Sequence, residues 1–205
     1  TSAVLVLATC MTACAPFLVA GVAGSALVAT DRRTSGTPLE DETIELRASA
    51  KVRDTFGEKV HVNVTSYNRQ VLLTGEVPSE RERQAVSAIV EKVENVKSVA
   101  NELSAMPNAS LGSRSNDLVV TGKIKATLID SRDLFANAFK VVTERNTVYL
   151  MGRVTQREAD SATALIRNVG GVNKVVRMFE IISEEELRRQ LPAPAEKADA
   201  DKAKK

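Results

Sequence analysis

The sequence of 205 residues has few of the side chains on which most enzymes and nucleic-acid-binding proteins depend. Aromatic residues make up 3% and Trp is absent, which argues against an aromatic platform for single-stranded nucleic acid. A single His, His61, excludes a zinc site built on two or three histidines. The net charge of +2 is too weak to indicate a strong nucleic-acid-binding surface. These absences disfavour both an enzyme and a nucleic-acid-binding protein.

Charged residues are also absent from residues 1–30. This segment exceeds the roughly 20 apolar residues that a membrane-spanning helix needs. Pro16, Gly21 and Gly24 argue against one continuous helix. The stretch AVLVLATCMTA before Cys14 is instead typical of the apolar core of an export signal that ends in small residues. An uncleaved helical anchor is the alternative interpretation.

The only two Cys residues, Cys10 and Cys14, both lie in this uncharged segment. Met11-Thr12-Ala13-Cys14 resembles a bacterial lipobox, in which small residues precede the Cys that is lipidated and becomes the mature N-terminus. Leu7-Ala8-Thr9-Cys10 competes with it, but Thr directly before the Cys is less usual. We therefore predict a lipid anchor on Cys14, with acyl chains such as palmitate. Ala15, rather than Asp, after the Cys resembles lipoproteins sorted to the outer membrane.

The rest of the chain contains one unit twice. The segment VLLTGEV at 71–77 matches VYLMGRV at 148–154, and their glycines are 77 positions apart. The Val residues at 93, 96 and 99 match those at 169, 172 and 175, and the apolar residues at 44, 48 and 52 match those at 120, 124 and 128. Three blocks in the same order indicate an internal repeat.

Each copy is predicted to fold as α-β-β-α-β. The first helix has apolar residues at i, i+4 and i+8, and the second begins at Ser79 or Thr155, both suitable N-caps. In the first copy we expect strands at 61–65 and 96–103, with a turn at 67–70 and a further strand between them that ends near the glycine. In the second copy we expect strands at 139–143 and 172–182, with a turn at 144–147 and again a strand that ends near the glycine. The predicted fold class is α+β, with two tandem units that each pack two helices on one face of a small mixed sheet.

This pattern resembles the BON domain, a module of bacterial envelope proteins. The resemblance depends on the apolar-Leu-x-Gly-x-Val cores at 71–77 and 148–154, on the helices that follow them and on the Val-x-x-Val-x-x-Val segments. A lipobox followed by two BON copies is similar to the DolP-type outer-membrane lipoproteins. The predicted organisation is a signal segment at 1–13, a lipidated N-terminus and linker at 14–41, BON domain 1 at 42–104, a linker at 105–116, BON domain 2 at 117–183, and a short helical extension with a disordered tail at 184–205.

No catalytic or metal-binding group is recognisable in the sequence. His61 has no nucleophile motif and no Asp partner, so we interpret it as structural or solvent-facing. Gly75 and Gly152 lie inside strand-like runs and are predicted to be structural glycines, with a ligand-cradling role as the alternative. The sequence predicts neither a cofactor nor a metal ion.

The two copies differ in charge. Residues 42–106 contain nine Lys or Arg and ten Asp or Glu, whereas residues 117–182 contain ten and seven. The second copy is therefore the better candidate for an anionic surface. If the apolar stripe at 120, 124 and 128 faces the core, the other sides of the same helix present apolar residues interleaved with Lys to the surroundings. These candidate phospholipid-binding residues are Leu118, Val119, Gly122, Lys123, Lys125 and Ile129.

Leu118 and Val119 have an alternative role, which is to pack against the first copy. The resemblance implies that the second BON domain binds anionic phospholipid through its first helix, where some members have an aromatic residue and this sequence has Val119. It also implies a non-enzymatic lipoprotein of a Gram-negative outer membrane that faces the periplasm and supports envelope integrity. The alternative is a periplasmic interaction protein that docks on an envelope-assembly or division partner.

Overall fold

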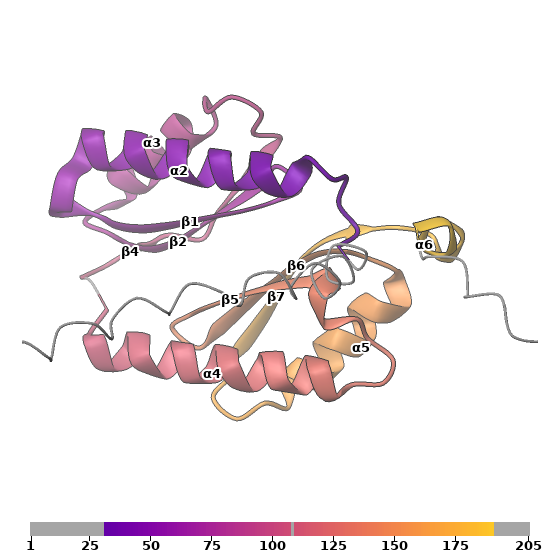
Figure 1. Cartoon of the computed structure of the whole chain (residues 1–205). Helices are drawn as coiled ribbons and strands as arrows, with labels where there is room; N and C mark the ends of the chain where they lie inside the picture. The colour runs from indigo at the N-terminus through magenta and orange to yellow at the C-terminus, as the bar shows by residue number, and fades with distance from the viewer. Residues whose placement is uncertain (1–30, 108, 191–205) are drawn as a thin grey trace, which may run out of the picture.

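The computed structural model describes residues 31–107 and 109–190, which fold into four layers (Figure 1). Two helices cover one sheet, two further helices cover a second sheet, and the inner faces of the sheets pack against each other. Each half is one repeat copy, so the expected α-β-β-α-β unit is confirmed. The expected signal segment, Cys14 and the tail beyond residue 190 lie outside the described residues.

The first copy forms a sheet around one antiparallel hairpin. Its elements are α2 (Thr37–Phe56), η1 (Gly57–Lys59), β1 (His61–Tyr67), β2 (Gln70–Val77), α3 (Glu80–Val90), β3 (Ser98–Asn101) and β4 (Ser104–Ala105). The short strands β3 and β4 both pair in parallel with β2. The single last strand expected at 96–103 is thus interrupted, because the Asn101 side chain accepts the Leu103 N–H and donates to the Arg83 carbonyl.

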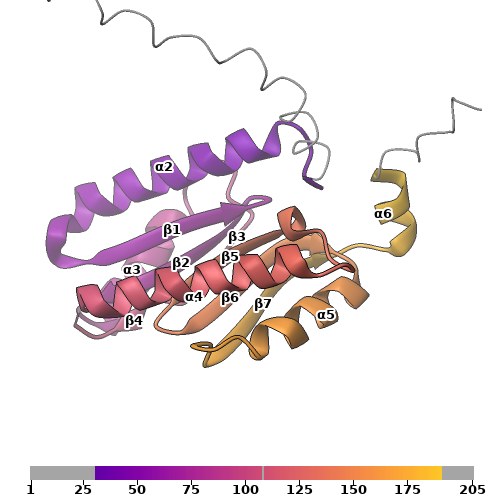
Figure 2. The same ribbon diagram turned by 60° about the horizontal axis from the view of Figure 1, so that its bottom comes forward.

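The second copy has the same order without that interruption. Its elements are α4 (Leu111–Asp130), η2 (Ala136–Ala138), β5 (Phe139–Glu144), β6 (Thr147–Val154), α5 (Gln156–Arg167), β7 (Lys174–Ile181) and α6 (Glu184–Gln190). β5 and β6 are antiparallel, and β7 pairs in parallel along the whole of β6. Figure 2 shows α4 and α5 side by side on the outer face of this sheet.

The first helix of each copy begins before the expected boundaries at 42 and 117. α2 begins at Thr37, because Pro38 fits the first turn of a helix, where no backbone N–H is needed. α4 begins at Leu111, because the Ser110 side chain caps it by accepting the Ser113 N–H at 3.2 Å. The N-caps expected for the second helices, Ser79 and Thr155, are confirmed.

Three apolar cores hold the layers together. The expected i, i+4, i+8 stripes are buried beneath the helices, at 44, 48 and 52 in α2 and at 120, 124 and 128 in α4. A third core lies between the sheets and joins Tyr67 and Leu72 of the first copy to Tyr149, Met151 and Met178 of the second. Every residue from 71 to 77 in β2 is buried, as expected of a strand covered on both faces.

Candidate functional site

The outward face of α4 displays large apolar side chains. Leu118 is 75% exposed, Val119 56% and Ile129 70%, while the stripe of Val120, Ile124 and Leu128 on the opposite side is buried. α4 lies in an outer layer of the molecule, with its own sheet between it and the first copy (Figure 1). The interpretation that Leu118 and Val119 pack against the first copy is therefore wrong.

Two lysines are interleaved with these apolar residues. Lys123 and Lys125 are exposed, and neither forms an ion pair with any described residue. Gly122, the remaining candidate, is also exposed and has no atom within 4 Å of the position of an added Cβ. The six residues singled out in the sequence thus lie together on one surface, called here the α4 face.

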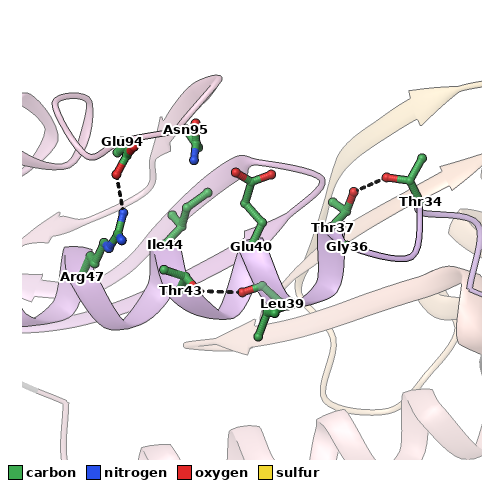
Figure 3. Close-up of a pocket in the computed structure, with 10 residues that line it drawn as sticks. All are labelled: Thr34, Gly36, Thr37, Leu39, Glu40, Thr43, Ile44, Arg47, Glu94 and Asn95. Carbon is green, nitrogen blue, oxygen red and sulfur yellow. Dashed lines mark hydrogen bonds and ion pairs between the residues drawn. The ribbon is translucent and has the colours of Figure 1, made fainter.

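The corresponding surface of the first copy is different. α2 contains three basic and five acidic residues, whereas α4 contains three basic and two acidic ones. Arg47, which matches Lys123 in the repeat, is held by Glu94 at 2.6 Å. Arg47 and Glu94 both line a cavity of about 440 Å³ beside α2, whose lining also includes the polar side chains of Glu40 and of three Thr residues (Figure 3). The first copy therefore offers no free basic residue at this position.

The two structural glycines lie at close approaches of the backbone. A Cβ at Gly75 would lie 2.1 Å from the carbonyl oxygen of His61, and one at Gly152 would lie 2.4 Å from that of Ala138. Gly75 also has a φ of +112°, a backbone conformation that residues with a Cβ rarely adopt. Both positions thus have a steric reason to be glycine, with no ligand involved.

A repeated aspartate that the sequence analysis missed fixes each hairpin. The buried carboxylate of Asp41 accepts the backbone N–H groups of Asn68 and Arg69 at 2.8 and 2.7 Å. Asp117, 76 positions later, accepts those of Arg145 and Asn146 at 2.8 and 2.9 Å. All four turn residues have positive φ, as this type of two-residue hairpin turn requires, and they lie outside the paired strands, so the carboxylates supply the acceptors for their N–H groups.

An ion pair between the copies involves Glu76, whose side chain is fully buried. Arg145 Nε of the second copy donates to its carboxylate at 2.9 Å, and His61 Nδ1 lies 3.0 Å from the other oxygen. Burial raises the pKa of Glu76, but hydrogen bonds from Arg145, the Ala109 N–H and His61 outweigh it and hold the pKa below its ordinary value. Of the two roles expected for His61, structural or solvent-facing, the contact with Glu76 favours the structural one.

A second buried ion pair fixes the segment that precedes α2. The guanidinium of Arg32 donates two hydrogen bonds of 2.7 Å to Glu158 at the start of α5, and one to the Arg153 carbonyl. Glu158 also completes the capping box with Thr155. Burial raises the pKa of Glu158, but the bonds from Arg32 and Thr155 outweigh it and lower the pKa overall. The segment that leads into the first copy is thus bound to the second copy, because Arg32 and Glu158, 126 residues apart in sequence, are in contact.

Across residues 31–107 and 109–190, no cluster of three or more His, Cys, Asp or Glu side chains could hold a metal ion. In the same residues no helix has both the length and the apolar character needed to cross a bilayer. The acidic residues at 184–186 form the first turn of α6, as expected from the favourable charge at a helix start.

Comparison with known proteins extends these observations. The chain is 35% identical over 171 residues to the outer membrane lipoprotein DolP of Haemophilus influenzae, which covers 82% of this chain and 89% of that protein. It is 32% identical over 154 residues to a 21 kDa hemolysin of Actinobacillus pleuropneumoniae, covering 74% and 79%. Among solved structures, a type III secretion structural protein of Chlamydia trachomatis, CdsD, aligns with 72% of this chain at 16% identity and a TM-score of 0.29.

The family model for the BON domain matches the chain twice, at residues 41–107 and 116–183. These two segments coincide with the two α-β-β-α-β copies and contain both hairpins, both structural glycines and both hairpin-binding aspartates. The protein is a member of the BON domain family with two tandem copies of the domain.

Proposed function

We propose that this chain is a non-enzymatic outer-membrane lipoprotein that is anchored through Cys14 and supports envelope integrity. We further propose that it binds anionic phospholipid through the second BON domain, with its body in the periplasm. The similarity to a relative named outer membrane lipoprotein DolP supports the location, together with the lipobox-like residues 11–14. No nucleic-acid surface is expected at a net charge of +2.

The observation that carries the lipid proposal is the α4 face. Leu118, Val119 and Ile129 are mostly exposed on one helix surface, beside two lysines without ion-pair partners among the described residues. Exposed apolar residues bordered by polar ones are typical of membrane and protein contacts. Apolar side chains that enter the headgroup region and lysines that meet lipid phosphates are the combination that interfacial helices use.

Charge reversal on this face provides the test. Lys123→Glu with Lys125→Glu removes two attractions of about 1 kcal/mol each, so binding to anionic vesicles falls more than tenfold. The measurement is co-sedimentation of residues 31–205 with phosphatidylglycerol vesicles, because the lipid anchor would retain the full protein whatever α4 does. The matched control is Arg47→Glu with Lys51→Glu on α2, which should bind almost as the wild type does.

A protein partner is the second candidate function, and α2 is the surface that favours it. Leu39 and Leu46 are 70% and 67% exposed on α2, and Leu39 also lines the cavity of Figure 3. If neither double variant changes vesicle binding, docking of the BON pair on an envelope-assembly or division protein replaces the lipid proposal. Equal losses in both variants would refute the asymmetry between the copies.

A further inference from the structure

A second cavity lies where the two BON copies and the segment before α2 meet. It has a volume of about 640 Å³, within the range of about 300–1,000 Å³ typical of small-molecule sites. Residues of α4 and β5 form one side, and Tyr67 with Asp31 and Arg33 form the other. Both copies are thus needed to build it, and neither would have it alone.

The inner wall of this cavity is apolar. Leu128, Phe139 and Tyr67 are buried at its base, and Val141 of β5 lies beside them. Ile129 belongs to the same lining but is 70% exposed, so it stands at the mouth. These apolar residues can accommodate a hydrocarbon chain, while charged residues complete the rest of the lining.

Most of the charge around the cavity is already neutralised. Arg33 is paired with Asp31 and Asp41, and its guanidinium lies 4.6 Å from the centre of the Tyr67 ring. Lys140 is held by Glu45 at 2.7 Å. Lys125 is the lining cation that has no ion pair with the described residues. Among the described residues of the lining, Lys125 is therefore the cation open to an anionic group that enters the cavity.

The cavity is continuous with the α4 face. Lys125 and Ile129 belong to both, so a lipid bound to that face reaches the cavity without crossing another surface. We infer that the cavity binds one acyl chain of a single anionic phospholipid, whose phosphate is held by Lys125. This inference rests on the proposed function and adds to it a discrete, saturable site between the copies.

The test uses a lipid that binds as a single molecule. Dihexanoyl phosphatidylglycerol, kept below its micelle-forming concentration, is titrated into residues 31–205, which contain every described contact, and methyl shifts of Ile129 and Val141 are followed. Saturable shifts at these methyls are expected. Dihexanoyl phosphatidylcholine should bind several-fold more weakly, because it has the chains without net charge. Glycerol 3-phosphate should not bind measurably, because it has the charge without the chains.

Filling the cavity should remove the site. Ala136→Phe places a ring in the space and should weaken binding of the short-chain lipid at least tenfold. The matched control is Thr43→Phe, which fills the cavity beside α2 instead and should bind as the wild type does. Should Ala136→Phe fail to fold, as judged by its melting curve, Asn137→Trp at an exposed position of the same lining provides the second obstruction.

The outcomes separate this inference from the function on which it rests. Wild-type affinity in both cavity variants, or equal binding of glycerol 3-phosphate and lipid, would overturn the inference. If anionic vesicles bind but the monomeric lipid does not, the cavity is not a lipid site and the proposal for the α4 face stands. If the monomeric lipid binds in the cavity but vesicles do not bind, the cavity inference stands and membrane binding through α4 is refuted.

Discussion

Gly75→Ala is the smallest change that tests how the BON hairpin is built. The new Cβ would lie 2.1 Å from the carbonyl oxygen of His61, a backbone atom, and must move to at least 3.0 Å. β1 therefore shifts by about 0.9 Å at the place where Val62 pairs with Gly75, or the hairpin distorts. In addition, the φ of +112° is strained for any residue with a Cβ.

These two effects set the expected magnitude. A residue held in a sparsely populated backbone conformation costs about 1–3 kcal/mol, and loss of one ladder hydrogen bond adds about 1 kcal/mol. We expect a decrease of about 2–4 kcal/mol in the free energy of unfolding. For a domain pair of this length, that corresponds to a Tm lower by about 5–15 °C. Gly152→Ala should lose less, because it shares the steric conflict but not the positive φ.

Thermal melting monitored by circular dichroism measures this directly. The matched control is Gly122→Ala, since Gly122 lies exposed in α4 with no atom within 4 Å of an added Cβ. That change should raise the stability by about 0.5–1 kcal/mol, as Gly-to-Ala does inside a helix. A Gly75→Ala variant that melts at the wild-type temperature would refute the argument from close approach.

Three other predictions concern the anchor and the buried ion pairs. Cys14→Ala should abolish outer-membrane fractionation while Cys10→Ala preserves it, and unchanged fractionation of the first variant would contradict the assigned lipobox. Arg32→Ala should lower the free energy of unfolding by about 3 kcal/mol in urea denaturation, because it leaves the buried Glu158 without its counter-ion; a loss below 1 kcal/mol would contradict this. The pKa values of Glu76 and Glu158 are lowered from an ordinary value near 4.5, so their ionised forms stabilise the fold above that pH. The Tm should therefore fall as the pH drops below about 4.5, and a Tm constant from pH 6 to pH 3 would refute their contribution.

The features that follow from a regular spacing of residues along one helix could be predicted from the sequence. The buried stripe of α4 follows from apolar residues at i, i+4 and i+8, and the exposure of Leu118 and Lys123 follows from their place off that stripe. Asp41 could have been found in the same way, because Asp117 is its counterpart 76 positions later and both lie one turn before the apolar stripe.

Contacts between distant segments could not be predicted. The run at 71–77 indicates a strand covered on both faces, but nothing in it identifies Tyr149 and Met151 as the partners of Leu72. Arg32 and Glu158 are 126 residues apart and belong to no periodic pattern. The cavity between the copies depends on how the two sheets pack, so its lining could not be assembled from either copy's sequence alone.

The two arginines before α2 fix the segment that leads into the first copy against both domains. Arg32 is bound to α5 of the second copy and Arg33 to Asp41 of the first, so consecutive residues join the copies at one point. The Arg32 guanidinium also lies 5.7 Å from the ring centre of Phe135, just beyond the end of α4. If the chain is anchored through Cys14 and binds lipid through α4 as proposed above, this junction would hold the α4 face at a high effective concentration near the bilayer, and a weak contact would be enough to set the orientation. In a chain anchored in this way, force from the membrane would reach both domains at once, because Arg32 contacts one copy and Arg33 the other.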